Sequence, residues 1–415
     1  MTLPALIADA DIPQVLGLSH LAQQVFDEVD LTPVFNSMTA RVNADSNDAA
    51  AWYDIALMLT LTGQIDRGLE IQALAMQASR LYRRVHGDGS DLRILAFVTP
   101  GDLMANTPLD FLLEGSNIRL DLLYVEPGVA LPAELPDHDL AFLAIGESKS
   151  NAVVLAALEP VLAAWPRPVV NGRPLQIAGL TRDGVAAQFA DSGRIVAPTT
   201  RRLTRADLYP LAVGETAVSD LLPGASFPII IRPIDSHAGL ALEKCDAPDD
   251  LAGYLAQHPG PEFFVTDYVD YASPDGKFRK QRVAIIGGVP FISHLAVSDH
   301  WMVHYLSAGM AEKAERRAEE AAFMEAFDND FAVRHAQALA EMTEGFGLDY
   351  YAIDCGETAD GQLLLFEADV AMIVHAMDSE TLFPYKKPAM KKLFAAFQQM
   401  LQATADHQAL GIRAA

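Results

Sequence analysis

The pattern of hydrophobic and polar residues divides the first half of the chain into two regions. In 1–88, apolar residues recur at helical spacing, most clearly in Ala49–Gly63 and Asp66–Arg84. After a Gly- and Ser-containing linker at 87–90, short apolar runs such as Leu92–Val98 alternate with helical segments. Such alternation is typical of a parallel α/β sheet. We therefore predict a helical region at 1–88, followed by an α/β domain at 89–204.

A β-hairpin is predicted near the C-terminus. Two apolar runs, Tyr350–Ile353 and Leu363–Phe366, flank Asp360-Gly361, a pair that favours a two-residue type I′ turn. With that turn, Asp354 faces Glu367 across the hairpin. Asp369 lies two residues beyond Glu367 and therefore on the same face of the strand.

Three carboxylates on one face of this hairpin point to a bound cation. Like charges opposite each other on a sheet repel, and burying them unpaired is costly. Carboxylate oxygens suit Mg²⁺, which is usually held by carboxylates together with substrate phosphates. The alternative is an exposed acidic hairpin. Apolar residues on both faces of the second strand, such as Leu363 and Leu364, argue against full exposure.

The hairpin resembles the metal-binding hairpin of the ATP-grasp superfamily, with the D-alanine–D-alanine ligases and the RimK-type amino-acid ligases as the most similar members. The resemblance rests on Asp354, twelve intervening residues, and then Glu367-Ala368-Asp369. It implies that Asp354, Glu367 and Asp369 bind Mg²⁺, as one or two ions that Mn²⁺ can replace, beside the phosphates of ATP. The family has Asn where this chain has Asp369, which keeps an oxygen donor and adds charge.

The same resemblance implies the fold. It predicts that 89–204 is the α/β domain preceding the ATP-grasp module and that 205–405 is the two-part module itself. The fold class is then α/β and α+β, with a helical N-terminal segment. That segment resembles a tetratricopeptide repeat in the order of Trp52, Ala56, Leu59, Gly63 and Ala73. A solenoid needs about three repeats and only one is evident, so a helical appendage or dimerisation element is favoured over a peptide-binding array.

The resemblance also implies an ATP site between 227 and 270. Arg232-Pro233 stands where the family has a phosphate-binding Lys-Pro, followed by a loop whose backbone covers the phosphates. Arg keeps the positive charge but is not equivalent to Lys, and the loop holds one Gly where the family often has several. The strand ending near Asp267 corresponds to the hinge that binds adenine, with Asp270 as the candidate ribose ligand. The implied ATP contacts are Arg232, Ser236, His237, Ala238, Gly239, Asp267, Tyr268, Val269 and Asp270.

Two basic residues are candidate catalytic groups. Lys280 and Arg282 are two residues apart and share one face of a predicted strand. In the family, a basic residue on this strand steadies the transferred phosphate, which makes Arg282 the first candidate and Lys280 the second. The alternative is a pair of solvated charges. D-alanine ligases also carry an Arg two residues before the metal-binding Asp, where this chain has Ala352.

Three histidines cluster at 294–304. His294, His300 and His304 are a candidate transition-metal site, because His300 and His304 would share a helical face. A loop over the acceptor site is the other functional reading, in which His304 or Trp301 contacts substrate. Ordinary packing is the third.

Composition limits the partners. The 415 residues carry a net charge of −25, with 51% hydrophobic and 20% charged residues. Without a basic cluster, nucleic acid is not an expected partner, and an ATP site must be locally basic. The only cysteines, Cys245 and Cys355, indicate no disulfide framework and fit the cytoplasm. We expect neither a signal peptide nor a membrane span.

We therefore predict an ATP-dependent carboxylate–amine ligase that joins small substrates through an acyl phosphate and releases ADP and phosphate. One alternative is an ATP-grasp kinase, or a ligase that modifies a peptide or protein recruited by the helical N-terminus. Another is a non-catalytic nucleotide-binding regulator. A homodimer is compatible with the helical segment.

Overall fold

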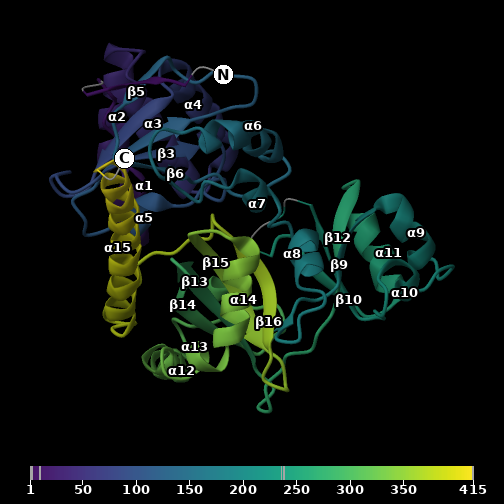
Figure 1. The fold of residues 1–415 in the computed structure, drawn as a ribbon. Coiled ribbons are helices and arrows are strands. Elements are labelled where there is room, and N and C mark those ends of the chain that lie inside the picture. The colour runs from purple at the N-terminus through teal and green to yellow at the C-terminus, as the bar shows by residue number, and fades with distance from the viewer. Residues whose placement is uncertain (1–2, 9–10, 235, 237–238, 414–415) are drawn as a thin grey trace.

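The computed structural model describes residues 3–8, 11–234, 236 and 239–413, with side chains up to residue 406. These residues form a mixed α/β fold with two five-stranded sheets, one four-stranded sheet and one two-stranded sheet. Figure 1 shows three bodies: the helical and α/β region, a small lobe, and a central sheet between them.

After the short strand β1, the N-terminal region is helical up to Ala78 and then joins a sheet. The predicted helix over Asp66–Arg84 is wrong after that point, because Leu81–Val85 forms a strand. Pairing with β4 and the ion pair between Arg83 and Asp121 (2.6 Å) override the helical periodicity. The boundary at 88 therefore does not separate helices from sheet. The elements are β1 (Ala5–Ile7), α1 (Leu18–Phe26), α2 (Thr32–Ala44), α3 (Ala49–Leu61), α4 (Ile65–Ala78) and β2 (Leu81–Val85).

The predicted α/β sheet is present, with strand order β2-β4-β3-β6-β7. All of its pairs are parallel except β2 with β4. The inner strands β3 and β6 are nearly continuous apolar runs and are almost wholly buried, as expected of strands covered on both faces. The elements are β3 (Arg93–Val98), α5 (Leu109–Leu112), β4 (Arg119–Tyr124), β5 (Glu134–Pro136), β6 (Leu140–Leu143), α6 (Ala152–Ala163), β7 (Val169–Val170), α7 (Pro174–Ala178) and α8 (Arg182–Gln188). The short strand β5 pairs with β1.

The small lobe on the right of Figure 1 is an antiparallel sheet, ordered β11-β10-β12-β9, covered by helices on one face. Its separate core includes Ile229, Ile231, Phe263 and Val265. The elements are β9 (Thr200–Thr204), α9 (Arg205–Ala212), α10 (Val218–Leu221), β10 (Ile229–Pro233), β11 (Glu243–Cys245), α11 (Pro248–Gln257) and β12 (Glu262–Asp267).

The central sheet has the order β14-β13-β15-β16-β8. It includes the predicted hairpin, β15 and β16. The elements are β8 (Ile195–Val196), β13 (Phe278–Ile286), β14 (Val289–Ser298), the 3₁₀ turn Tyr305–Ser307, α12 (Ala314–Ala326), α13 (Phe331–Arg334), α14 (Ala336–Phe346), β15 (Tyr350–Glu357), β16 (Leu363–Asp369) and α15 (Lys386–Arg413).

The predicted turn of the hairpin is wrong, but the predicted pairing of Asp354 with Glu367 is confirmed. The tip is not a two-residue turn: Thr358 N–H donates to the Gln362 carbonyl, and Gly361, at φ +75°, lies in a longer loop. The register shifts again between Asp354 and Cys355, which leaves Phe366 as an extra residue in β16. This β-bulge offsets the longer turn. Asp354 therefore faces Glu367, as predicted.

Helix α15 joins the two large sheets. The Phe397 ring lies 6.0 Å from Phe142 of the parallel sheet and 5.2 Å from Tyr350 of the central sheet. Leu393 and Leu401 are buried in the same core cluster. In Figure 1 this helix runs down the left side of the molecule, beside both sheets. The central sheet is thereby fixed to the N-terminal region.

Within the described part of the chain, no helix combines the length and apolar character needed to cross a bilayer.

Candidate functional site

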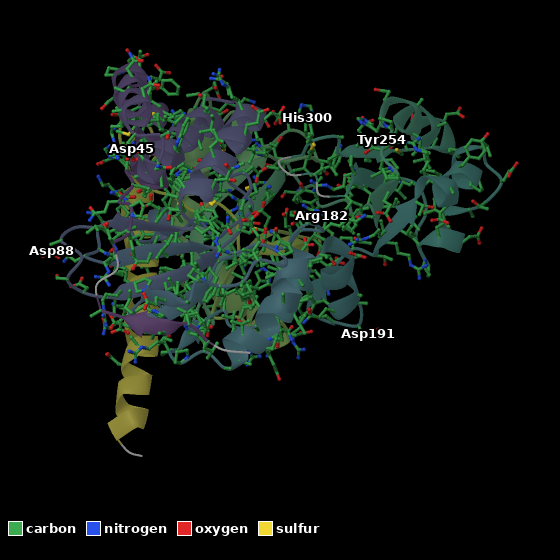
Figure 2. All side chains as sticks on the ribbon, turned by 90° about the horizontal axis from the view of Figure 1, so that it is seen from above. Asp45, Asp88, Arg182, Asp191, Tyr254 and His300 are labelled. Atoms are coloured by element: carbon green, nitrogen blue, oxygen red, sulfur yellow. The ribbon has the colours of Figure 1, made fainter. Side chains whose placement is uncertain are left out.

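A cavity of about 610 Å³ lies between the small lobe and the central sheet. Strands β10 and β12 form one wall, strands β13, β15 and β16 form another, and the segment 301–312 lies across it. Figure 2 shows Arg182 between the lobe that carries Tyr254 and the rest of the molecule. The predicted residues that line the cavity are Arg232, Gly239, Asp267, Tyr268, Val269, Lys280, Arg282, Trp301, His304, Asp354 and Glu367.

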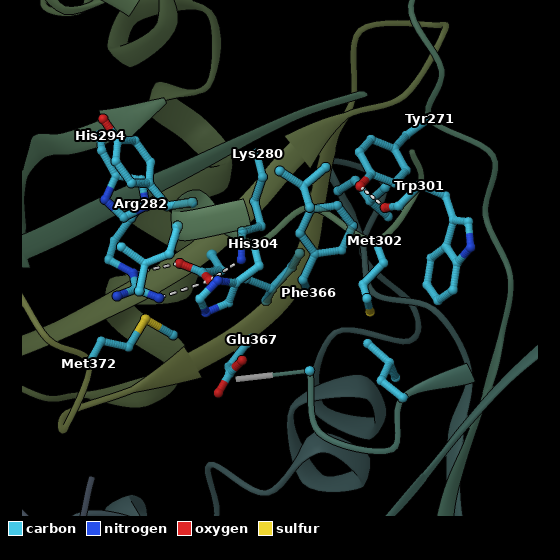
Figure 3. Close-up of a pocket in the computed structure, with 18 of the residues that line it drawn as sticks. Tyr271, Lys280, Arg282, His294, Trp301, Met302, His304, Phe366, Glu367 and Met372 are labelled. Atoms are coloured by element: carbon cyan, nitrogen blue, oxygen red, sulfur yellow. Dashed lines mark hydrogen bonds and ion pairs between the residues drawn. The ribbon is translucent and has the colours of Figure 1, made fainter. Parts of the chain in front are cut away.

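Four polar side chains form a row across the central sheet. His294 pairs with Arg282, Arg282 with Asp354, and Asp354 with Glu367. Residues opposite one another on adjacent strands project from the same face. The row therefore runs along the wall of the cavity, where Figure 3 shows Arg282, Lys280 and His304 close together.

Asp354 is held by two cations. Arg282 Nε and Nη2 donate to its two carboxylate oxygens at 2.8 and 3.0 Å, and Lys280 Nζ donates at 2.8 Å. Arg282 also donates to the Ile373 carbonyl at 3.0 Å. Burial acts to raise the pKa of Asp354, but the charges of Arg282 and Lys280 outweigh it and hold that pKa well below its usual range. Asp354 is therefore a carboxylate at neutral pH.

Glu367 and Asp369 have different environments. Arg182 Nη2 lies 3.0 Å from Glu367 Oε2, and Asp369 Oδ1 accepts the Ala371 N–H at 3.0 Å. Burial raises the pKa of Asp369 to about 7, and the nearby Glu367 adds to that rise. Both residues line a small second cavity of about 40 Å³, and Asp369 is absent from the described lining of the large one. The hairpin thus gives Asp354 and Glu367 to the large cavity and Asp369 to a neighbouring one.

The donor set fits a hard cation at one edge of the cavity. Glu367 and Asp369 are acidic oxygen ligands of the kind that Mg²⁺ prefers. Burial raises the pKa of Asp369 although the Ala371 N–H donates to it, so the protein compensates its carboxylate charge poorly. Asp354 is already paired with Arg282 and Lys280, so a metal ion there would compete with them. Among the described residues, no three His, Cys, Asp or Glu side chains gather as a metal-holding group.

Arg232 lies at the end of β10, where phosphate binding was predicted. It is buried, and its Nε donates to Ser236 Oγ at 2.9 Å. Burial, with the charge of Arg182 adding to it, lowers its pKa to about 10, so it remains cationic at neutral pH. Ser236 lines the small cavity and Gly239 the large one. The predicted contacts at His237 and Ala238 lie outside the described residues.

The predicted hinge follows β12 directly. Asp267, Tyr268 and Val269 line the cavity. The Tyr268 ring lies edge-on to Trp301 at 5.9 Å, and Lys244 Nζ lies 5.0 Å from its centroid. Asp270 is absent from the described lining and accepts the Ala272 N–H at 3.0 Å, which stabilises the turn after the hinge. The structure therefore does not place Asp270 with the other predicted ATP contacts.

The three histidines separate. His294 and His304 line the cavity, whereas His300 is absent from its described lining. The His294 ring packs on Tyr305 at 4.5 Å. Burial and the charge of Arg282 hold the pKa of His294 well below its usual value. The described residues contain no transition-metal group of the kind considered from the sequence.

Several cavity residues were not identified from the sequence. Arg182 begins α8, far along the chain from the hairpin it contacts. Its neighbours Thr181 and Asp183 give the pattern of a helix start, with no signal of a distant ion pair. The segment after β16 has no periodicity that would predict an element. It supplies Met372, His375 and Asp378 to the cavity, and the first residue of α15 supplies Lys386.

No protein-family model matches the sequence, and no curated protein matches it. The chain is similar to solved structures of D-alanine–D-alanine ligases and a RimK domain protein. One is the Bacillus anthracis D-alanine–D-alanine ligase complexed with ATP, at 14% identity over 76% of this chain and 97% of that chain, with a TM-score of 0.44.

Two others are similar in extent. The RimK domain ATP-grasp protein from Sphaerobacter thermophilus shows 15% identity over 74% of this chain and 98% of that chain, with a TM-score of 0.39. The VanG D-Ala:D-Ser ligase from Enterococcus faecalis shows 11% identity over the same shares, with a TM-score of 0.45. At TM-scores below 0.5, the function rests on the residues of this chain.

Proposed function

We propose that this protein is an ATP-dependent ligase that joins a carboxylate to an amine. ATP phosphorylates the carboxylate to an acyl phosphate and leaves as ADP. The amine then attacks the acyl carbon, phosphate leaves, and the amine loses a proton. The substrates are a small carboxylate and a small amine. A peptide acceptor, a homodimer and a cytoplasmic location are compatible with this chemistry, which involves neither nucleic acid nor a membrane.

The observation that carries the proposal is the local charge of the cavity. The chain has a net charge of −25. Although the described lining of the cavity balances five cations with five carboxylates, four of the cations, Arg182, Arg232, Lys280 and Arg282, act electrostatically on two of the carboxylates, Asp354 and Glu367. Such a local excess of positive charge inside an acidic protein attracts a polyanion. A nucleoside triphosphate has the charge and the size for it.

The nucleotide is proposed to lie with its base at the hinge. Tyr268 and Val269 offer backbone groups and a ring beside apolar Ile230 and Leu242, which also line the cavity. Asp267 lies at the same place, and Asp270 stays a weaker candidate for the ribose. Arg232 binds phosphate oxygens with its planar fork. Backbone groups of Ser236 and Gly239 are proposed to complete the phosphate contacts, and the predicted contacts at His237 and Ala238 lie outside the described residues.

Mg²⁺ is proposed to bind to Glu367 and Asp369, with Asp354 as a third ligand if the ion displaces part of its pairing with Arg282 and Lys280. Bound there, one or two Mg²⁺ or Mn²⁺ ions would neutralise phosphate charge. Arg282 and Lys280 hold Asp354 in position and place their own positive charge where the phosphoryl group is transferred. Charge that is already oriented towards a transition state lowers the barrier to reaction. His304 and Trp301 are the candidate substrate contacts from the covering segment.

Trapping with hydroxylamine tests this proposal. The protein is incubated with Mg-ATP, a pool of amino acids and small carboxylic acids, and hydroxylamine as a substitute amine. ADP and a hydroxamate that form together support the ligase. ADP without hydroxamate favours a kinase. Neither product, with Mg-ATP binding shown by a thermal shift, contradicts a small-molecule ligase and favours a regulator or a macromolecular substrate.

A further inference from the structure

One end of the cavity is built by residues outside the predicted nucleotide contacts. The segment after β16 contributes Met372, His375 and Asp378, and the N-terminal region contributes Phe26 and Met104. This end adjoins the site of phosphate transfer, because Ile373, beside Met372, accepts a hydrogen bond from Arg282. It is therefore within reach of an acyl group activated beside Arg282.

The charges at this end suit an amine. The buried Lys386 ammonium lies 3.1 Å from Asp378 and 3.5 Å from Glu320, so two carboxylates share one cation. Glu320 is fully enclosed, and Tyr385 and Tyr305 donate to it at 2.7 and 3.0 Å. Asp378 is the member of the pair that lines the cavity. Lys386 thus neutralises Asp378 only in part, which leaves an acceptor for a substrate ammonium group.

Phe26 closes the apolar side of the same end. It is the last residue of α1, and its ring lies 6.3 Å from the His375 ring. Phe26 remains 43% exposed although it is a large apolar residue. Its open face is therefore available to an apolar substituent.

Hydrogen bonds just before α1 and in its first turn fix the helix that carries Phe26. The buried Asp54 carboxylate accepts the Leu16 N–H at 2.9 Å, and Asp110 accepts the Ser19 N–H at 2.6 Å. These two acids come from α3 and α5. Carboxylates at a helix N-terminus stabilise it through both hydrogen bonds and the helix dipole. A fixed helix gives the cavity a wall of defined position.

We propose that Phe26 is a specificity-determining residue that limits the size of the amine's apolar substituent, while Asp378 binds the ammonium group. This assignment rests on the proposed ligase function. It gives the helical N-terminal region a role in the active site, because α1 supplies one wall of the acceptor pocket. A smaller residue at position 26 opens that wall to larger amines.

Phe26→Ala tests the assignment, with Val29→Ala as the matched control. Val29 lies three residues further on, is 51% exposed, and is absent from the described lining of the cavity. ADP release is measured with the acid identified by hydroxylamine trapping and a series of amines: glycine, alanine, valine, leucine and phenylalanine. For Phe26→Ala we expect kcat/KM for leucine or phenylalanine, relative to glycine, to rise about tenfold or more. The KM for ATP should stay within about twofold.

The possible results distinguish a failure of the role assigned to Phe26 from a failure of the proposed ligase function. An unchanged amine profile in Phe26→Ala, with the wild type active, overturns the role of Phe26 and leaves the ligase intact. A shift in the profile of Val29→Ala as large as that of Phe26→Ala overturns it as well. A wild type that makes neither ADP nor hydroxamate overturns the proposed function, and the inference falls with it.

Discussion

Arg282 and Asp354 face each other on neighbouring strands and are joined by two hydrogen bonds of 2.8 and 3.0 Å. Asp354 in turn faces Glu367 on the next strand. This row connects the two chemical groups that the proposed function needs. One is a cation for the transferred phosphate, and the other is a set of carboxylates for a metal ion.

Removing Arg282 should destabilise the protein. Breaking one side of a buried ion pair costs about 3–5 kcal/mol, and Lys280 still pairs with Asp354, so we expect Arg282→Met to lose about 3 kcal/mol. Adding Asp354→Asn should restore part of that loss. Urea unfolding of the single and double variants measures the coupling. Arg279→Met is the control on the same strand, because its two partners, Asp275 and Glu319, are far more exposed than Asp354, so the loss of stability should be clearly smaller. No coupling between Arg282 and Asp354 would contradict the account.

Glu367→Gln should abolish turnover without unfolding the protein. The substitution keeps the shape of the side chain but removes the charge that is proposed to hold Mg²⁺ and that pairs with Arg182. We expect ADP release to fall about 10²-fold or more. Circular dichroism checks the fold. Asp360→Asn, at the exposed tip of the same hairpin, should retain wild-type activity. Equal losses in both variants would argue against a metal role for Glu367.

Arg232→Ala should weaken ATP binding selectively. A charge-assisted hydrogen bond contributes about 1.5–3 kcal/mol, so the KM for ATP should rise about tenfold or more while the KM for the amine changes little. Arg201→Ala is the control, because Arg201 is an exposed residue of β9 in the same sheet and is absent from the described cavity lining. Steady-state kinetics with each substrate varied in turn would show the difference. A larger effect on the amine would place the phosphates elsewhere.

Asn171→Ala should destabilise the protein by removing the hydrogen bonds that join the α/β domain to the hairpin. The buried Asn171 side chain donates to the Tyr350 carbonyl at 2.7 Å and accepts the Asp349 and Tyr350 N–H groups at 2.9 Å. Its φ of +54° also disfavours Ala. We expect a loss of about 3 kcal/mol or more in the free energy of unfolding. Asn171→Gly loses the same side-chain hydrogen bonds, but glycine adopts a positive φ without strain. It should therefore be about 1 kcal/mol less destabilising than Asn171→Ala. The reverse order of the two variants would contradict this explanation.

Asp54 should make stability depend on pH. Burial raises its pKa from 3.8 to about 6, so the folded protein binds its proton more tightly than the unfolded chain does. The stabilisation of the folded protein by protonated Asp54 is therefore complete below about pH 4 and is lost as the pH rises through about 6. The change is about 3 kcal/mol, from roughly two pKa units. Asp54→Asn should remove this slope in unfolding measured across that range, while the exposed Asp91→Asn should retain it. If the free energy of unfolding changed equally with pH in the wild type and in Asp54→Asn, Asp54 would not be the cause of the pH dependence.

Local signals in the sequence were enough to predict the hairpin, but not its details. The register at Asp354 and Glu367 was predicted from a turn that the structure does not have, because the bulge at Phe366 compensates for the longer loop. The strand Leu81–Val85 was predicted as a helix because its partner β4 lies about forty residues away in the sequence. Pairing between distant segments is not encoded in local periodicity.

The same limit applies to the site. The family resemblance implied that Lys280 or Arg282 reaches the active site, but their pairing with Asp354 appears only in the structure, where β13 and β15 are neighbours. Arg182 and Phe26 come from helices far from the hairpin in the sequence, and only the tertiary fold brings them to the cavity. Asp270 was predicted to bind the ribose because of its position after the hinge. In the structure its carboxylate accepts a hydrogen bond from the Ala272 N–H within a local turn.

The most direct test of the central claim follows an oxygen atom. The carboxylate substrate identified by hydroxylamine trapping is labelled with ¹⁸O in both carboxyl oxygens and is incubated with unlabelled ATP and the amine. If an acyl phosphate forms, one labelled oxygen leaves in each phosphate released and the other stays in the amide, which mass spectrometry detects. Phosphate released without label, while amide forms, would contradict activation of the carboxylate by phosphoryl transfer in this cavity.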